Sequence, residues 1–167
     1  MSFPILRGFI AGLAGGLAWL AGIALFFGPA QRILTNPALQ SAKMLAVFTS
    51  EPAPRSAGAP WLLAAGLLVI GVLWGWVYVW VSGPWPGAWW RRGLRFGVVS
   101  WVLMVPWFEF YLPWNVLWEP APLVTLEMMC WAGVLTGVGL TIAGVDAALR
   151  PGHELVASPR WPAGQAT

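Results

Sequence analysis

Two long stretches of this chain, residues 8–27 and residues 60–82, contain no charged residue. At about 1.5 Å per residue, a helix of twenty residues spans roughly 30 Å, the thickness of the hydrocarbon core of a bilayer. Within that core the backbone amides must find partners inside the chain, and a helix provides them. The two stretches therefore predict membrane-spanning helices, and lipid becomes the expected solvent for the rest of the chain.

Two further apolar segments, residues 92–112 and 122–149, complete the pattern. The third contains Pro106, which lacks an amide N–H and predicts a kink or hinge within the helix. We therefore expect an all-α integral membrane protein, a four-transmembrane-helix antiparallel bundle that forms a single domain over residues 1–150. Residues 151–167 are polar and rich in proline and glycine, which predicts a flexible tail.

The composition agrees with a lipid environment. Hydrophobic residues make up 59% of the chain and charged residues only 9%, whereas soluble domains carry about 25% charged residues. Fourteen tryptophans are present, and tryptophan is enriched where a bilayer meets water. The net charge of +3 comes from basic residues beside apolar runs, so we expect contacts with lipid headgroups and no nucleic-acid partner.

The distribution of basic residues predicts the orientation. With four spans both termini lie on the same side, and that side holds six basic residues: Arg7, Arg91, Arg92, Arg95, Arg150 and Arg160. The other side holds Arg32, Lys43 and Arg55. The positive-inside rule then places both termini in the cytoplasm. We expect the protein to lie in the inner (plasma) membrane of the cell. The connection at residues 113–121 faces outward, and so does a possible short interfacial helix at residues 37–49.

Glycines four residues apart mark the helix faces that we expect to pack closely. These helix-packing residues are Gly8, Gly12, Gly16, Gly71, Gly75, Gly133 and Gly137. Small residues at this spacing let two helix backbones approach each other. The contact can lie within the bundle or between two copies of the chain.

Two carboxylates lie inside the apolar segments. Glu109 follows Arg95 by fourteen residues and Glu127 follows Pro122 by five, which places both at a similar depth, roughly 8 Å inside the outer boundary. Ionisable residues within a membrane are rare and mark functional sites. The two carboxylates either meet and share a proton, pair with a basic residue of the 28–59 loop, or lie wetted at the interface.

We include Tyr111 and Trp107 with the two glutamates in the candidate proton or ligand site, and Pro106 as its hinge. No nucleotide-binding, hydrolase or zinc-protease motif appears in the chain, and its single cysteine, Cys130, lies in an apolar run. We therefore expect no cofactor, no metal and no catalytic residue.

Three functions remain open from the sequence. The first is a non-enzymatic membrane protein that packs as a homo-oligomer or as an accessory subunit of a larger membrane complex. The second is a small transporter or proton-coupled permease that uses the intramembrane carboxylates. The third is a membrane enzyme that acts on lipid.

Overall fold

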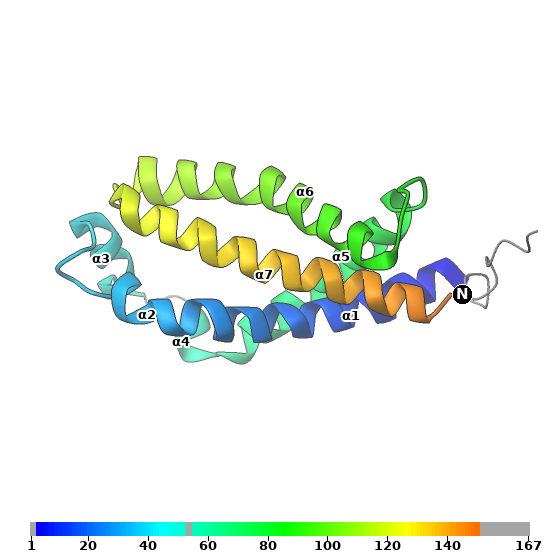
Figure 1. Cartoon of the computed structure of the whole chain (residues 1–167). Coiled ribbons are helices and arrows are strands. Elements are labelled where there is room, and N and C mark those ends of the chain that lie inside the picture. The colour runs from blue at the N-terminus through cyan, green and yellow to red at the C-terminus, as the bar shows by residue number, and fades with distance from the viewer. Residues whose placement is uncertain (1–2, 53–54, 151–167) are drawn as a thin grey trace, which may run out of the picture.

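The computed structural model describes residues 3–52 and 55–150, and all regular structure in this part of the chain is helical (Figure 1). The elements in order are α1 (Phe3–Gly22), η1 (Ile23–Phe27), α2 (Gly28–Leu34), α3 (Ala42–Thr49), α4 (Arg55–Gly58), α5 (Trp61–Val81), α6 (Trp89–Glu109), η2 (Phe110–Val116) and α7 (Ala121–Ala148). The predicted all-helical fold is confirmed. The predicted tail, residues 151–167, lies outside the described residues.

Four continuous helical segments are long and apolar enough to cross a membrane: Phe3–Leu34, Trp61–Val81, Trp89–Val116 and Ala121–Ala148. The protein is therefore a small four-span membrane protein in contact with a lipid bilayer. The first and third segments extend further than the apolar runs alone indicated. Each of them continues past a proline. Pro29 lies directly after the π-helical turn η1, and Pro113 lies within the π-helical turn η2. A wider π turn accommodates a proline ring that would collide with the carbonyl four residues back in a regular α-helix.

The four segments pack in the order α5, α1, α7, α6. In Figure 1, α7 lies between α1 and α6, and α3 and the α6–α7 connection are at the end opposite the N-terminus. We call these ends the terminal end, which holds Phe3 and Arg150, and the corner end, which holds η2 and the start of α7. Aromatic side chains of α5 and α6 also meet, because the Phe96 ring lies 5.7 Å from Trp74 and 5.2 Å from Tyr78.

The predicted short helix between the first two spans is present as α3. It begins at Ala42 because the Ser41 side chain caps it and accepts a hydrogen bond of 3.0 Å from the Met44 N–H. Before it, the Asn36 side chain accepts a hydrogen bond of 3.0 Å from the Ala38 N–H, which holds this stretch in a turn. The helix is therefore shorter than the 37–49 stretch.

The glycines of α1 and α5 lie against each other. A methyl group built on Gly71 would lie 2.5 Å from the backbone nitrogen of Gly16 and 2.6 Å from the carbonyl oxygen of Gly12. A methyl group on Gly75 would lie 2.5 Å from the Cα of Gly12, and one on Gly8 would lie 2.5 Å from the Trp76 ring. Five of the seven glycines thus form one intramolecular contact between α1 and α5.

The remaining two glycines of that set lie elsewhere, on α7. Gly133 faces the Phe26 ring, which a methyl group would approach to 2.5 Å, whereas a methyl group on Gly137 would meet nothing within 4 Å. The close contact of α7 with α6 uses glycines that the sequence reasoning did not select: Gly93, Gly97 and Gly139. Gly137 therefore has no packing partner within the described chain.

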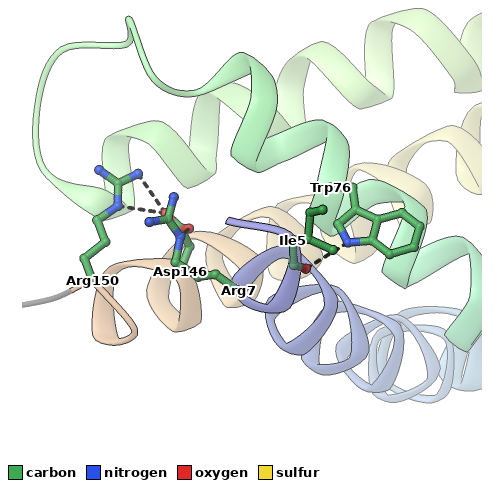
Figure 2. A network of polar contacts seen from close by, with 5 residues as sticks. All are labelled: Ile5, Arg7, Trp76, Asp146 and Arg150. Carbon is green, nitrogen blue, oxygen red and sulfur yellow. Dashed lines mark hydrogen bonds and ion pairs between the residues drawn. The ribbon is translucent and has the colours of Figure 1, made fainter. Parts of the chain in front are cut away.

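The core of the bundle is apolar, but its terminal end is polar. Asp146 on α7 is fully buried, and its carboxylate lies 2.5 Å from the Arg7 Nε and 2.8 Å from the Arg150 Nη2 (Figure 2). Arg150 follows Asp146 by four residues, so this contact lies within one helical turn of the chain. The contact with Arg7 joins α1 to α7, and it forms only because these two helices pack side by side.

Candidate functional site

Glu109 and Glu127 meet at the corner end of the bundle. Glu109 is the last residue of α6 and its exposed fraction is 1%. Glu127 lies in the second turn of α7, where it is half-buried. Because α6 and α7 are neighbours connected by a short turn, the two carboxyl groups lie within hydrogen-bonding range of each other, and Glu109 is also within range of the Trp131 side chain.

Nothing in the described part of the chain neutralises this pair. Oε2 of Glu109 is buried without a hydrogen-bond partner among the described residues. The basic residues of the first loop, Arg32, Lys43 and Arg55, form no ion pair with either glutamate. Two carboxylates this close to each other, one of them fully buried, cannot both stay ionised without a large energetic cost. The arrangement therefore favours a proton shared between them.

A third carboxylate, Glu119, lies beside the pair and was missed by the sequence reasoning. Its exposed fraction is 3%, and its backbone N–H donates a hydrogen bond of 2.8 Å to the Pro113 carbonyl. Burial raises the pKa of the Glu119 carboxyl above its ordinary value of 4.5, and the nearby Glu127 raises this pKa further. The surrounding Pro-rich turn resembles an ordinary solvated loop, so no local pattern of residues indicates this burial.

The loop before Glu119 is held in an unusual conformation. Trp118 has a φ of +59°, in the left-handed region that a side chain as large as indole rarely adopts. Three contacts from the first loop and α3 hold this segment: Ser41 Oγ donates to the Leu117 carbonyl at 2.5 Å, Lys43 Nζ donates to the Val116 carbonyl at 3.4 Å, and the Lys43 ammonium lies 4.7 Å from the centre of the Trp118 ring. Strained residues that the surrounding structure holds in place are common at binding sites.

An open cavity of about 380 Å³ lies at this loop, lined by Trp114, Asn115, Trp118 and Glu119. Glu119 links the cavity to the carboxylate pair, because it lies close enough to both Glu127 and Glu109 to interact with them electrostatically. The cavity at the corner end is thus lined by two indole rings, an amide and the Glu119 carboxyl group. The carboxyl groups of Glu109 and Glu127 lie near that of Glu119.

Trp107 and Tyr111 do not join the carboxylates. Their rings stack on each other with centroids 5.1 Å apart, and both side chains are exposed on the outer face of the bundle. Trp107 lines a separate apolar groove of about 510 Å³ between α5 and α6. The aromatic residues of the site are instead Trp131 beside Glu109, and Trp114 and Trp118 at the cavity.

Pro106 lies inside α6, three residues before Glu109. The helix continues past it, because the Phe110 N–H donates to the carbonyls of both Pro106 and Trp107, and the chain then widens into the π-helical η2. The predicted role of Pro106 as a hinge stays a prediction.

The described residues contain no group of three histidine, cysteine, aspartate or glutamate side chains placed to hold a metal ion. Cys130 is buried, and its thiol donates a long hydrogen bond of 3.5 Å to the Phe26 carbonyl, while its neighbour Met129 points outward. The chain matches no family model, no curated protein and no solved structure. The function therefore has to be argued from the geometry of the corner end.

Proposed function

We propose that the protein is a small proton-coupled permease and that the Glu109–Glu127 pair is its proton-binding site. The observation that carries this proposal is a fully buried carboxyl group on one membrane helix facing a second carboxyl group on the next, with no described cation beside them. A pair of this kind holds a proton in one state and releases it when water or a cation reaches it.

The distribution of basic residues supports an orientation for this site. Of the eight basic residues that the structure describes, five belong to the terminal end, and this majority favours placing that end in the cytoplasm. The corner end then opens to the outside of an inner membrane, and the carboxylate pair would exchange protons with that side. Between the two ends the core is apolar, with Trp19, Val134 and Val138 buried in it. Transfer of a proton from the corner end to the terminal end would therefore require a change in helix packing, for which Pro106 offers a hinge position.

The structure gives less support to packing as a homo-oligomer or as an accessory subunit. That hypothesis depended on glycine faces available to a partner, and five of the seven glycines lie in the α1–α5 contact within the chain. Native mass spectrometry of the protein extracted from its membrane tests this hypothesis directly, because it reports both the number of copies and any retained subunit.

The proton-binding proposal is tested first on Glu109. In lipid vesicles at neutral pH, the infrared carbonyl band of a protonated carboxylic acid should be present in the wild type and lost in Glu109→Gln. Proton movement under an imposed gradient, followed by a pH-sensitive dye inside the vesicles, should fall to the level of empty vesicles in the same variant. Glu51→Gln, at an exposed position, is the control and should behave as the wild type.

Two results would contradict the proposal. One is an unchanged carbonyl band in a folded protein that carries both Glu109→Gln and Glu127→Gln, which would assign the proton to a group outside the pair. The other is wild-type proton movement no faster than in empty vesicles over a range of pH and membrane potential, which would leave the carboxylates a structural role.

A further inference from the structure

The cavity at the corner end combines three kinds of side chain that recognise one kind of ligand. Trp114 and Trp118 supply aromatic rings, Asn115 supplies an amide, and Glu119 supplies a carboxyl group whose Oε2 is buried without a hydrogen-bond partner among the described residues. Aromatic faces attract cations through their quadrupole, and pairs of them form the cages that recognise quaternary ammonium groups. A carboxylate completes such a cage by its charge.

The chain itself already places an ammonium group against one of the rings that line this cavity. The Lys43 Nζ lies 4.7 Å from the centre of the Trp118 ring. Lys43 is exposed, and among the described residues it otherwise makes the long hydrogen bond of 3.4 Å to the Val116 carbonyl. A ring that attracts a tethered ammonium from a flexible side chain also attracts a free one, so Lys43 marks the chemistry of the site and competes for it.

Size and burial fit a small ligand rather than an acyl chain. The cavity measures about 380 Å³ and is smaller and more polar than the apolar groove of about 510 Å³ between α5 and α6. An anion is disfavoured because Glu119 lines the cavity and two more carboxyl groups lie behind it. A small organic cation would therefore gain from both the indoles and the carboxylates.

We propose that the cavity formed by Trp114, Asn115, Trp118 and Glu119 binds a small ammonium group, either as a free amine or as the ammonium headgroup of a lipid. This inference deepens the function proposed above, on which it rests, because it names the class of cation that the proton site would exchange with. Its test measures binding alone and needs no proton movement, so the two proposals can fail independently.

The experiment uses the full chain in nanodiscs of phosphatidylglycerol, a lipid whose headgroup has no ammonium group. Radiolabelled choline should bind saturably, and unlabelled choline should displace it. Dimethylbutanol, the uncharged isostere of choline, should not displace it at the same concentration. Equal displacement by the two compounds, or no saturable binding of choline, would overturn the proposal.

Three variants connect the binding to the cavity. Trp118→Leu should weaken choline binding roughly two- to thirty-fold, which is the range expected for the loss of one cation–π contact, and Trp118→Phe should restore part of it. Trp61→Leu is the matched control, because Trp61 has an exposed fraction of 67% against 69% for Trp118 and lies on α5 outside the cavity. Wild-type affinity in a folded Trp118→Leu protein would overturn the assignment.

Lys43→Gln provides a test in the opposite direction. Removal of the tethered ammonium frees the Trp118 ring and removes a nearby positive charge, so this variant should bind choline several-fold more tightly than the wild type. Weaker binding in a folded Lys43→Gln protein would show that Lys43 holds the Trp118 segment in its binding conformation, and it would overturn the competition between Lys43 and the ligand.

A second nanodisc composition distinguishes the source of the ammonium group. If a lipid headgroup is the natural ligand, replacing phosphatidylglycerol by phosphatidylcholine should raise the choline concentration needed for half-occupancy, and Trp118→Leu should remove this dependence on lipid. If a free amine is the ligand, choline should bind with the same affinity in both lipids. Both results support the ammonium site, and each names one source.

Discussion

Glu119 is the third carboxyl group at the corner end of the bundle. It lies in the connection between two membrane spans, yet it is almost fully buried beside Glu127 and Glu109. Burial and the neighbouring carboxylate raise the pKa of Glu119 above 4.5. A carboxyl group of this kind binds its proton more tightly in the folded protein than in the unfolded chain.

The stability of the protein should therefore depend on pH through Glu119. Because the folded protein binds the Glu119 proton more tightly, this proton stabilises the folded state fully below pH about 4.5. The stabilisation is lost as the pH rises from there through the higher pKa of Glu119 in the folded protein. The thermal unfolding temperature of the wild type in detergent should fall over this interval, and Glu119→Gln should make the fall smaller. Glu51→Gln, at an exposed position, should leave the wild-type profile unchanged. An identical slope in Glu119→Gln would contradict the assigned burial.

At the residue scale the sequence predicted part of the site. The depths of Glu109 and Glu127 followed from helix rise and bilayer thickness, and the structure brings these two residues together. The outward orientation of Trp107 and Tyr111 could not be predicted, because which face of α6 and η2 points outward depends on how α7 packs against them, and their role in a proton or ligand site stays a prediction. Glu119 could not be found, since its burial results from the left-handed turn at Trp118 and not from any local periodicity.

At the scale of helices, the contact of α1 with α5 depends on the absence of side chains. Gly71 lies against the backbone of Gly12 and Gly16, so even a methyl group would force the helices apart. Gly71→Ala should therefore destabilise the protein by about 2 kcal/mol, in the range measured for overpacked sites. Thermal unfolding in mild detergent is the measurement.

Gly137→Ala is the matched control for this substitution. The residue is also a helical glycine of a membrane span, but a methyl group there meets nothing within 4 Å. Alanine is the better helix former, so this variant should be neutral or slightly more stable than the wild type. Equal losses in Gly71→Ala and Gly137→Ala would contradict the α1–α5 contact, whereas a loss of oligomer in Gly137→Ala alone would identify α7 as an interface between copies.

The helices themselves were largely predictable, because apolar length alone determines where a chain crosses a bilayer. Their ends were less so, since the π-helical turns η1 and η2 carry the first and third segments past prolines that usually end a helix. The glycine spacing in α1 and α5 correctly marked residues of close approach. The same four-residue spacing of Gly93 and Gly97 on α6 was available in the sequence and was overlooked.

At the scale of the whole molecule, the two ends of the bundle contain buried charge of different kinds. The corner end gathers carboxyl groups that form no ion pair with a described basic residue, which supports the proposed binding of a proton or a cation. At the terminal end, by contrast, the buried Asp146 is paired with two guanidinium groups. The charge count of the sequence predicted that basic residues gather at this end, but it could not predict that one of them connects α1 to α7.

This difference predicts that the terminal end stabilises the protein and the corner end does not. Asp146→Asn leaves Arg7 and Arg150 without their carboxylate (Figure 2), and loss of one partner of a buried ion pair costs about 3 kcal/mol. The unfolding temperature in mild detergent should fall by roughly 5 °C or more. Glu109→Gln removes a buried charge that has no cationic partner among the described residues, so the same measurement should show no loss or a small gain. A large loss of stability in Glu109→Gln would mean that its carboxylate is held by a cation, which would contradict the shared proton on which the proposed function depends.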